Sequence, residues 1–251
     1  MKKKRLKNKT VLITGATSGI GFAAAQRAIE EGAFVVFTGR NPDQIVLTQE
    51  QFGSQSLGIQ CDHSSLASQD HFIEKMQQLS IKFDVIYINA GNVSHEAFGQ
   101  WTVEQFDAIF DTNVKGPFFL IQRLLPMIKP HASVILCGST SIHIALEKSS
   151  VYAASKIALR SLVKTLSREL LAQQIRFNLL SPGPTLTPAL NKVASTPAEV
   201  EQLKASIENL VPIQRLADPV EIANAFIYLA SDEARFIVGS ELLVDGGVAN
   251  L

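Results

Sequence analysis

The most constraining feature of this 251-residue sequence is a glycine-rich turn between a short apolar run and a helical pattern. The turn reads TGATSGIG at residues 14–21, follows a strand predicted over Thr10–Ile13 and precedes a helix predicted over 22–31. Glycines at such a turn let the backbone approach a pyrophosphate, whose charge is met by free N–H groups at the positive end of the helix. The context predicts a dinucleotide-binding β-α unit, although the spacing G-x-x-x-G-x-G differs from GxGxxG.

Short β-branched runs alternate with helical patterns along the rest of the chain. The further strand-like runs cover 34–38, 57–60, 85–88, 133–137, 176–180 and 241–244. They are continuously apolar, as expected when helices cover both faces of a parallel sheet. The sequence therefore predicts an α/β fold, a doubly wound (Rossmann) parallel sheet of about seven strands with helices on both faces. We expect one domain over 1–251, since α/β domains often reach this length.

Helix boundaries can be read at two places. Thr102 followed by Gln105 predicts a capping box, and Asp218-Pro219 predicts an N-cap with proline at the first helical position. The longest interruption of the rhythm, 181–210, is rich in proline and threonine and has a helical stretch near 198–209. We expect a mobile lid over the ligand around 185–215.

The charge pattern favours a small-molecule partner. Lys+Arg and Asp+Glu both number 23, so no overall field attracts nucleic acid or an anionic membrane. The basic run at 2–9 resembles a signal peptide or a nucleic-acid-binding arm, but the apolar residues 11–13 are too few for a signal core, which favours a solvated terminus. The most apolar helical pattern, 118–128, contains Arg123 and Pro126 and is too short for a membrane span. We expect a cytoplasmic protein with neither membrane nor nucleic-acid partner.

Neither cysteine nor histidine shows a metal-binding pattern. Cys61 and Cys137 lack CxxC spacing, and the five scattered histidines form no HExxH motif. We predict no metal cofactor.

The end of the second strand bears on which cofactor is used, because the chain there reaches the adenosine ribose. Residues 38–41 contain no acid that would bind the 2′-hydroxyl of NAD, whereas Arg40 offers a charged planar fork for a 2′-phosphate. The alternative is that Arg40 is only a solvated turn residue. NADP(H) is preferred and NAD(H) stays open.

Tyr152 and Lys156 open a helical pattern and are four residues apart, so both side chains project from the same face of the helix. An ordinary tyrosine keeps its proton at neutral pH, so acting as an acid/base requires a nearby cation that stabilises the phenolate. Lys156 is placed to supply that charge.

Taken together, these motifs resemble the short-chain dehydrogenase/reductase family, in its single-domain subgroup of roughly 250 residues. The resemblance covers essentially the whole chain. Besides TGATSGIG and YAASK, the matching segments are Asp62, Asn89-Ala90-Gly91, Asn113-Val114-Lys115-Gly116, Gly138-Ser139, Arg176-Phe177-Asn178, Ser181-Pro182-Gly183-Pro184, Thr187 and Val244-Asp245-Gly246-Gly247.

The resemblance implies four catalytic residues. Ser139, 13 positions before Tyr152, would polarise the substrate carbonyl, although Thr140 and Ser141 are neighbouring hydroxyls. Tyr152 would donate or accept the proton, Lys156 would hold the nicotinamide ribose and stabilise the phenolate, and Asn113 would orient a water.

The resemblance also implies the cofactor-binding set: Gly15, Thr17, Ser18, Gly19, Ile20, Gly21, Arg40, Asp62, Asn89, Ala90, Gly91, Tyr152, Lys156, Pro182, Gly183, Thr185 and Thr187. Two departures concern the adenosine side. Ile88 precedes Asn89 where many members have a second asparagine, and His63 follows Asp62 where an apolar residue is commoner. His143 either borders the substrate pocket or lies on a surface loop, the reading we favour.

The predicted activity is hydride transfer between NADP(H) and a carbonyl or alcohol substrate, with 3-oxoacyl reduction as one candidate. The alternatives are a catalytically silent nucleotide-binding regulatory protein on the same fold, or epimerisation or dehydration on that scaffold. Apolar helices around 118–120 and 152–171 imply, as in the family, a homotetramer or homodimer.

Overall fold

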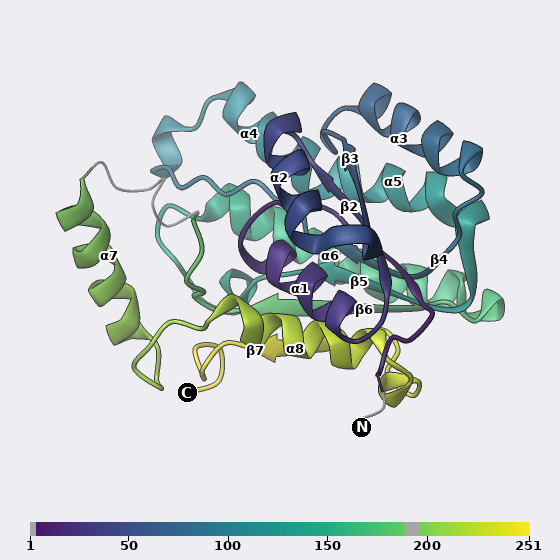
Figure 1. The fold of residues 1–251 in the computed structure, drawn as a ribbon. Coiled ribbons are helices and arrows are strands. Elements are labelled where there is room, and N and C mark those ends of the chain that lie inside the picture. Colours follow the sequence, from purple (N-terminus) through teal and green to yellow (C-terminus); the bar gives the residue numbers. More distant parts are fainter. Residues whose placement is uncertain (1–3, 189–195) are drawn as a thin grey trace.

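The computed structural model describes residues 4–188 and 196–251, and its centre is one parallel β-sheet (Figure 1). The strands are β1 (Thr10–Ile13), β2 (Phe34–Gly39), β3 (Ser56–Gln60), β4 (Phe83–Ile88), β5 (Ile128–Cys137), β6 (Arg176–Pro182) and β7 (Glu241–Val244). They lie in the order β3-β2-β1-β4-β5-β6-β7, and every neighbouring pair is parallel. The predicted seven-stranded doubly wound sheet is confirmed.

Helices cover both faces of this sheet. The α-helices are α1 (Gly19–Glu30), α2 (Pro42–Phe52), α3 (Leu66–Gln78), α4 (Val103–Phe110), α5 (Gly116–Leu124), α6 (Ser150–Glu169), α7 (Pro197–Leu210) and α8 (Pro219–Ala230). Side chains of α1, α2 and α8 join the apolar cluster on one face, and those of α3, α5 and α6 join the cluster on the other. No helix in the described ranges is long and apolar enough to span a bilayer.

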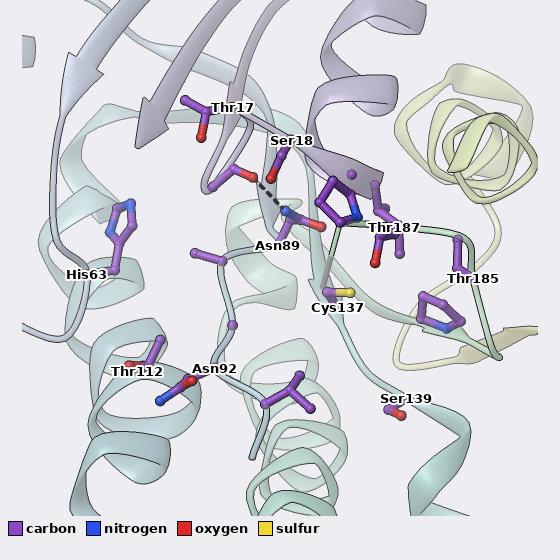
Figure 2. Close-up of a pocket in the computed structure, with 18 of the residues that line it drawn as sticks. Thr17, Ser18, His63, Asn89, Asn92, Thr112, Cys137, Ser139, Thr185 and Thr187 are labelled. Carbon is purple, nitrogen blue, oxygen red and sulfur yellow. Dashed lines mark hydrogen bonds between the residues drawn. The ribbon is translucent and has the colours of Figure 1, made fainter. Parts of the chain in front are cut away.

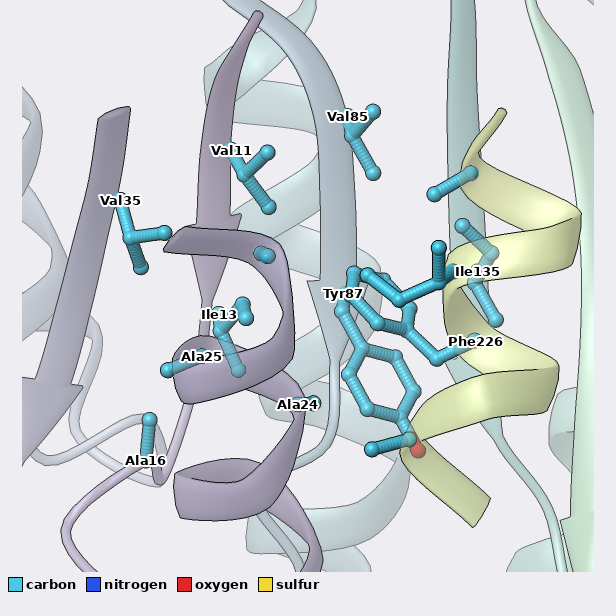
Figure 3. Close-up of a cluster of buried hydrophobic side chains, with 14 of the residues drawn as sticks. Val11, Ile13, Ala16, Ala24, Ala25, Val35, Val85, Tyr87, Ile135 and Phe226 are labelled. Carbon is cyan, nitrogen blue, oxygen red and sulfur yellow. The ribbon is translucent and has the colours of Figure 1, made fainter. Parts of the chain in front are cut away.

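Strand β1 shows why the central strands contain continuous apolar runs. Val11 and Ile13 point into the cluster beneath α1 and α8, whereas Leu12 points into the cluster on the opposite face. Figure 3 shows the first of these clusters, in which Tyr87 of β4 stacks on Phe226 of α8 with ring centroids 4.7 Å apart. Because successive side chains of a strand alternate between two covered faces, the three buried positions of β1, 11–13, are all apolar, and only the half-buried first position holds a polar residue, Thr10.

The predicted capping signals are present. Thr102 Oγ1 accepts a hydrogen bond from Gln105 N at 3.2 Å, and Gln105 Oε1 accepts one from Thr102 N at 3.0 Å. Helix α8 begins at Pro219, as predicted, and the Glu221 carboxylate accepts a hydrogen bond from Asp218 N at 2.9 Å. Helix α7 is the helical stretch expected near 198–209. Residues 189–195 of the predicted lid lie outside the described residues, and lid motion stays a prediction.

The region before β5 differs from the sequence interpretation. The helical pattern predicted over 118–128 ends at Leu124, and Pro126 lies in a tight turn over Leu125–Met127. Proline lacks the N–H that a continuing helix needs, which explains the earlier end. Strand β5 then begins at Ile128, five residues before the predicted start, because Ile128 pairs with Phe83 ahead of an irregularity in register.

Candidate active site

A cavity of about 430 Å³ opens at the carboxyl ends of the central strands. Its walls come from the glycine turn after β1 and from the segments that follow β2, β3, β4, β5 and β6, together with the first turns of α6. The strand order reverses at β1, which lies between β2 and β4. In open α/β sheets ligands bind at such a switch point, so the fold itself locates the site.

Most residues predicted from the sequence line this one cavity. They are Gly15, Thr17, Ser18, Gly19, Ile20, Arg40, Asp62, Asn89, Ala90, Gly91, Ser139, Tyr152, Lys156, Pro182, Gly183, Thr185 and Thr187. Figure 2 shows Thr17 and Ser18 on one side of the cavity, with Ser139 and Thr185 across from them. Two predicted residues, Gly21 and Asn113, are not part of the lining.

The glycine turn has the geometry of an anion cradle. Gly15 and Gly19 have φ of 66° and 56°, the left-handed region that glycine enters without steric cost. Ser18 is the N-cap residue of α1, but its side chain makes no capping hydrogen bond, and the first turn of α1 contains no acidic residue. The N–H groups and positive end of α1 are therefore available to a phosphate.

Gly21 acts from behind the turn. A Cβ at this position would collide with Gly15 O and stand 2.5 Å from Asn89 Nδ2. Asn89 Nδ2 donates hydrogen bonds to Thr14 O at 3.0 Å and Gly15 O at 3.1 Å, while Thr14 Oγ1 accepts from Ala90 N at 2.9 Å. Asn89 thus fastens the turn to the end of β4, in addition to lining the cavity.

Arg40, Asp62 and His63 line the adenosine side of the predicted site. Burial raises the pKa of Asp62, but hydrogen bonds from Ser64 and the charge of Arg40 outweigh it, so the net pKa is lowered. His63 is buried, and its Nε2 lies 2.7 Å from Thr38 Oγ1. Burial lowers the pKa of His63 to about 4, against a weaker opposing effect of Asp62, so this ring is neutral at pH 7.

The predicted catalytic side chains Ser139, Tyr152 and Lys156 share the other end of the cavity. Lys156 is only 4% exposed; its Nζ donates a hydrogen bond to Cys137 O at 2.8 Å and lies 5.8 Å from the centroid of the Tyr152 ring. Of the three neighbouring hydroxyl residues, only Ser139 lines the cavity, while Thr140 and Ser141 are buried away from it. The geometry therefore favours the hydroxyl that the 13-residue interval indicated.

Asn113 lies in a wide helical turn, Asp111–Lys115, between α4 and α5. Its Oδ1 accepts a hydrogen bond from Asn92 N at 2.7 Å, and its Nδ2 donates to Asn92 O at 2.9 Å and to Ser155 Oγ at 3.0 Å. The side chain thus joins the segment after β4 to α6 from behind the cavity. Its predicted role in orienting a water stays a prediction.

Sequence reasoning missed several residues of the lining: Gly39, Cys61, His63, Asn92, Val93, Thr112, Cys137, Gly138 and Pro188. Most adjoin predicted residues at the ends of strands, so position relative to the sheet edge was the signal that could have found them. In the described ranges, no group of three or more His, Cys, Asp or Glu residues is arranged to hold a metal ion.

A carboxylate near the site was also missed. Glu241, at the start of β7, has a side chain only 10% exposed and accepts hydrogen bonds from His143 Nε2 at 2.8 Å and Ser181 Oγ at 2.6 Å. Arg160 Nε of α6 lies 2.9 Å from its second oxygen. His143 lies in a turn and is not among the residues that line the cavity, in keeping with the loop position favoured above, and its half-buried side chain pairs with Glu241.

A doubly wound sheet whose switch point brings together a glycine turn, a serine, a tyrosine and a lysine defines the class of nicotinamide-dependent oxidoreductases. Comparison with known proteins makes the assignment specific. The family model described as enoyl-(acyl carrier protein) reductase matches residues 15–249. The chain belongs to the short-chain dehydrogenase/reductase family and is an oxidoreductase acting on CH–OH or C=O groups.

Similar proteins match over nearly their whole length. An oxidoreductase of Sarocladium schorii is 36% identical over 249 residues, covering 98% of both chains. A 3alpha-hydroxysteroid dehydrogenase of Mediterraneibacter gnavus is 35% identical, covering 96% of this chain and 97% of the relative. The crystal structure of a short-chain dehydrogenase/reductase (glucose/ribitol dehydrogenase) from Brucella melitensis superposes with a TM-score of 0.90 at 27% identity, covering 98% of each chain.

Proposed function

We propose that this enzyme transfers a hydride between NADP(H) and a carbonyl or alcohol substrate, with Tyr152 as the acid/base. The observation that carries the proposal is that Ser139, Tyr152 and Lys156 line the same cavity as the glycine turn. A 3-oxoacyl compound is the first substrate class to test, because a similar solved structure, 33% identical and covering 98% of this chain, is described as a putative betaketoacyl-ACP reductase.

The residues of the cavity fit a dinucleotide. The uncapped start of α1 and the two left-handed glycines, Gly15 and Gly19, suit a pyrophosphate. Because Gly21 has no Cβ, the turn can lie close to Asn89. Lys156 would bind the ribose hydroxyls near the reacting centre. When bound, the cofactor supplies or accepts the hydride.

Three side chains would manage the substrate oxygen and its proton. During reduction, Ser139 Oγ donates a hydrogen bond to the carbonyl oxygen, and the Tyr152 hydroxyl gives its proton to the same oxygen as the hydride reaches the carbon. The Lys156 ammonium stabilises the phenolate that remains on Tyr152. In the oxidation of the alcohol the proton moves the other way, from the substrate hydroxyl to the phenolate of Tyr152.

Arg40 supports the preference for NADP(H). It is exposed, lines the cavity after β2 and is the only charged residue of 38–41. A guanidinium binds a phosphate through charge-assisted hydrogen bonds, whereas a 2′-hydroxyl makes no comparable contact with it.

Replacing Tyr152 by phenylalanine tests the proposal. The substrate is first found with a panel of ketones and aldehydes assayed with NADPH and NADH side by side. Tyr152→Phe should lower kcat by about 100-fold or more, since general acid catalysis contributes that much, while NADPH affinity stays near wild type. Tyr228→Phe in α8 is a matched control that should keep full activity. Wild-type turnover by Tyr152→Phe would refute the assigned role.

We also propose a homotetramer or homodimer, because apolar side chains of α4, α5 and α6 are exposed, among them Val103, Phe106, Phe118 and Ile157. Sedimentation equilibrium at micromolar concentration tests this, and a monomer would contradict it. The cytoplasmic location and the absence of membrane and nucleic-acid partners stay predictions.

A further inference from the structure

His95 contacts the tyrosine to which we assign proton transfer. It lies in the segment after β4, and its ring stands edge-on to that of Tyr152, with centroids 6.0 Å apart and planes at 64°. No motif in the sequence singled it out. His95 is exposed and is not among the residues that line the cavity, but its ring contact places it directly beside Tyr152, which does line the cavity.

Two hydrogen bonds hold this segment against the start of α6. His95 Nδ1 lies 2.8 Å from Ser149 Oγ, and Glu96 N donates to Lys148 O at 2.9 Å. Ser149 is the N-cap residue of α6, but its hydroxyl makes no capping hydrogen bond and is directed to His95 instead. Lys148 has φ of 61°, a left-handed conformation uncommon for lysine. His95 is therefore held against Ser149, which lies three residues before Tyr152 in the chain.

The same contact decides which ring nitrogen carries the proton. Ser149 is only 1% exposed, and its hydroxyl has no acceptor other than His95 among the described residues. A buried hydroxyl proton needs an acceptor, so Ser149 Oγ donates to Nδ1 and the neutral ring carries its proton on Nε2. Burial lowers the pKa of His95, which keeps the ring neutral at pH 7. Nε2 has no hydrogen-bond partner in the described part of the chain.

We propose that His95 is a specificity-determining residue whose Nε2–H donates a hydrogen bond to a second oxygen of the substrate, close to the carbonyl bound at Tyr152. The inference rests on the proposed function and narrows its substrate. An uncharged N–H donor suits an ester, thioester or ketone oxygen, and it forms no hydrogen bond with a hydrocarbon chain. The preferred substrates are therefore carbonyl compounds with a second oxygen nearby, such as β-keto esters.

Two ketones of equal chain length test this. Ethyl acetoacetate carries an ester oxygen near its ketone, and 2-heptanone carries only methylenes there. His95→Phe keeps an aromatic ring beside Tyr152 but removes both nitrogens. His95→Phe should lower kcat/KM for ethyl acetoacetate about tenfold, mainly by raising KM. It should change kcat/KM for 2-heptanone by less than about twofold.

Two further substitutions separate recognition from loop structure. His95→Asn places an amide near the Nδ1 position, so it retains the contact with Ser149 but loses the outer donor, and it should resemble His95→Phe. His95→Gln reaches the Nε2 position and should retain most of the selectivity for the keto ester. His71→Phe, at an exposed histidine of α3, is the matched control and should leave both rates unchanged.

The inference is overturned if His95→Phe and His95→Asn lower kcat/KM for both ketones by the same factor, because a purely structural role does not distinguish the two substrates. It is also overturned if neither variant changes kcat/KM for either ketone. Should His95→Phe fail to fold, as judged by circular dichroism, the comparison of His95→Asn with His95→Gln decides. Failure of the proposed function looks different, since Tyr152→Phe would then retain turnover whatever the selectivity at position 95.

Discussion

Gly21 does not itself line the cavity, but replacing it by alanine perturbs the glycine turn through Gly15 and Asn89, which do. The new Cβ would collide with Gly15 O and stand 2.5 Å from Asn89 Nδ2, two atoms that are themselves hydrogen-bonded at 3.1 Å. The methyl group would therefore force the turn away from the end of β4. We expect both cofactor affinity and stability to fall.

The magnitude follows from these two contacts. Overpacking a rigid backbone costs about 1–3 kcal/mol, and the strained or lost hydrogen bond between Asn89 and Gly15 adds about 1 kcal/mol. The sum, about 2–4 kcal/mol, divides between the free energy of unfolding and the free energy of cofactor binding. If the whole cost fell on cofactor binding, about 2 kcal/mol would already weaken the affinity for NADPH about 30-fold.

Urea unfolding and titration calorimetry with NADPH measure the two parts separately. Gly99→Ala is the matched control, because a Cβ there meets nothing within 4 Å and its φ is not in the left-handed region. It should leave NADPH affinity unchanged and alter stability by less than about 1 kcal/mol. If Gly21→Ala matches the wild type in both measurements, the steric account of the turn is wrong.

Two further predictions concern the adenosine side of the site. Arg40→Ser should raise the KM for NADPH about tenfold or more, through loss of a charge-assisted phosphate contact, and leave the KM for NADH within about threefold; an unchanged ratio would remove the argument for NADP(H). His63 has a folded-state pKa of about 4, below its ordinary 6.5, so the unfolded state binds the proton more tightly. The contribution of neutral His63 to the free energy of unfolding is complete above pH 6.5 and is lost as the pH falls toward 4. Between pH 7 and pH 5 the free energy of unfolding should fall by about 2 kcal/mol from this group. Urea unfolding at the two pH values should therefore show a smaller decrease for His63→Gln than for the wild type, and equal decreases would contradict the assignment.

Local patterns predicted much of the fold because their causes are local. The apolar run of β1 and the turn at 14–21 follow from the burial of both strand faces and from the backbone freedom of Gly15 and Gly19. The early start of β5 at Ile128 was missed, because its partner Phe83 lies 45 residues away in the chain and no local period signals that pairing.

The sequence by itself determined the α/β class, the place of the dinucleotide turn and the common face of Tyr152 and Lys156, since strand alternation and the helical period act over a few residues. Only the tertiary structure decided which neighbouring hydroxyl lines the cavity, that Asn113 lies behind it, and that His95 stands against Tyr152. These outcomes depend on how segments distant in the chain pack at the carboxyl edge of the sheet, where loop geometry is set by long-range contacts rather than by local periodicity.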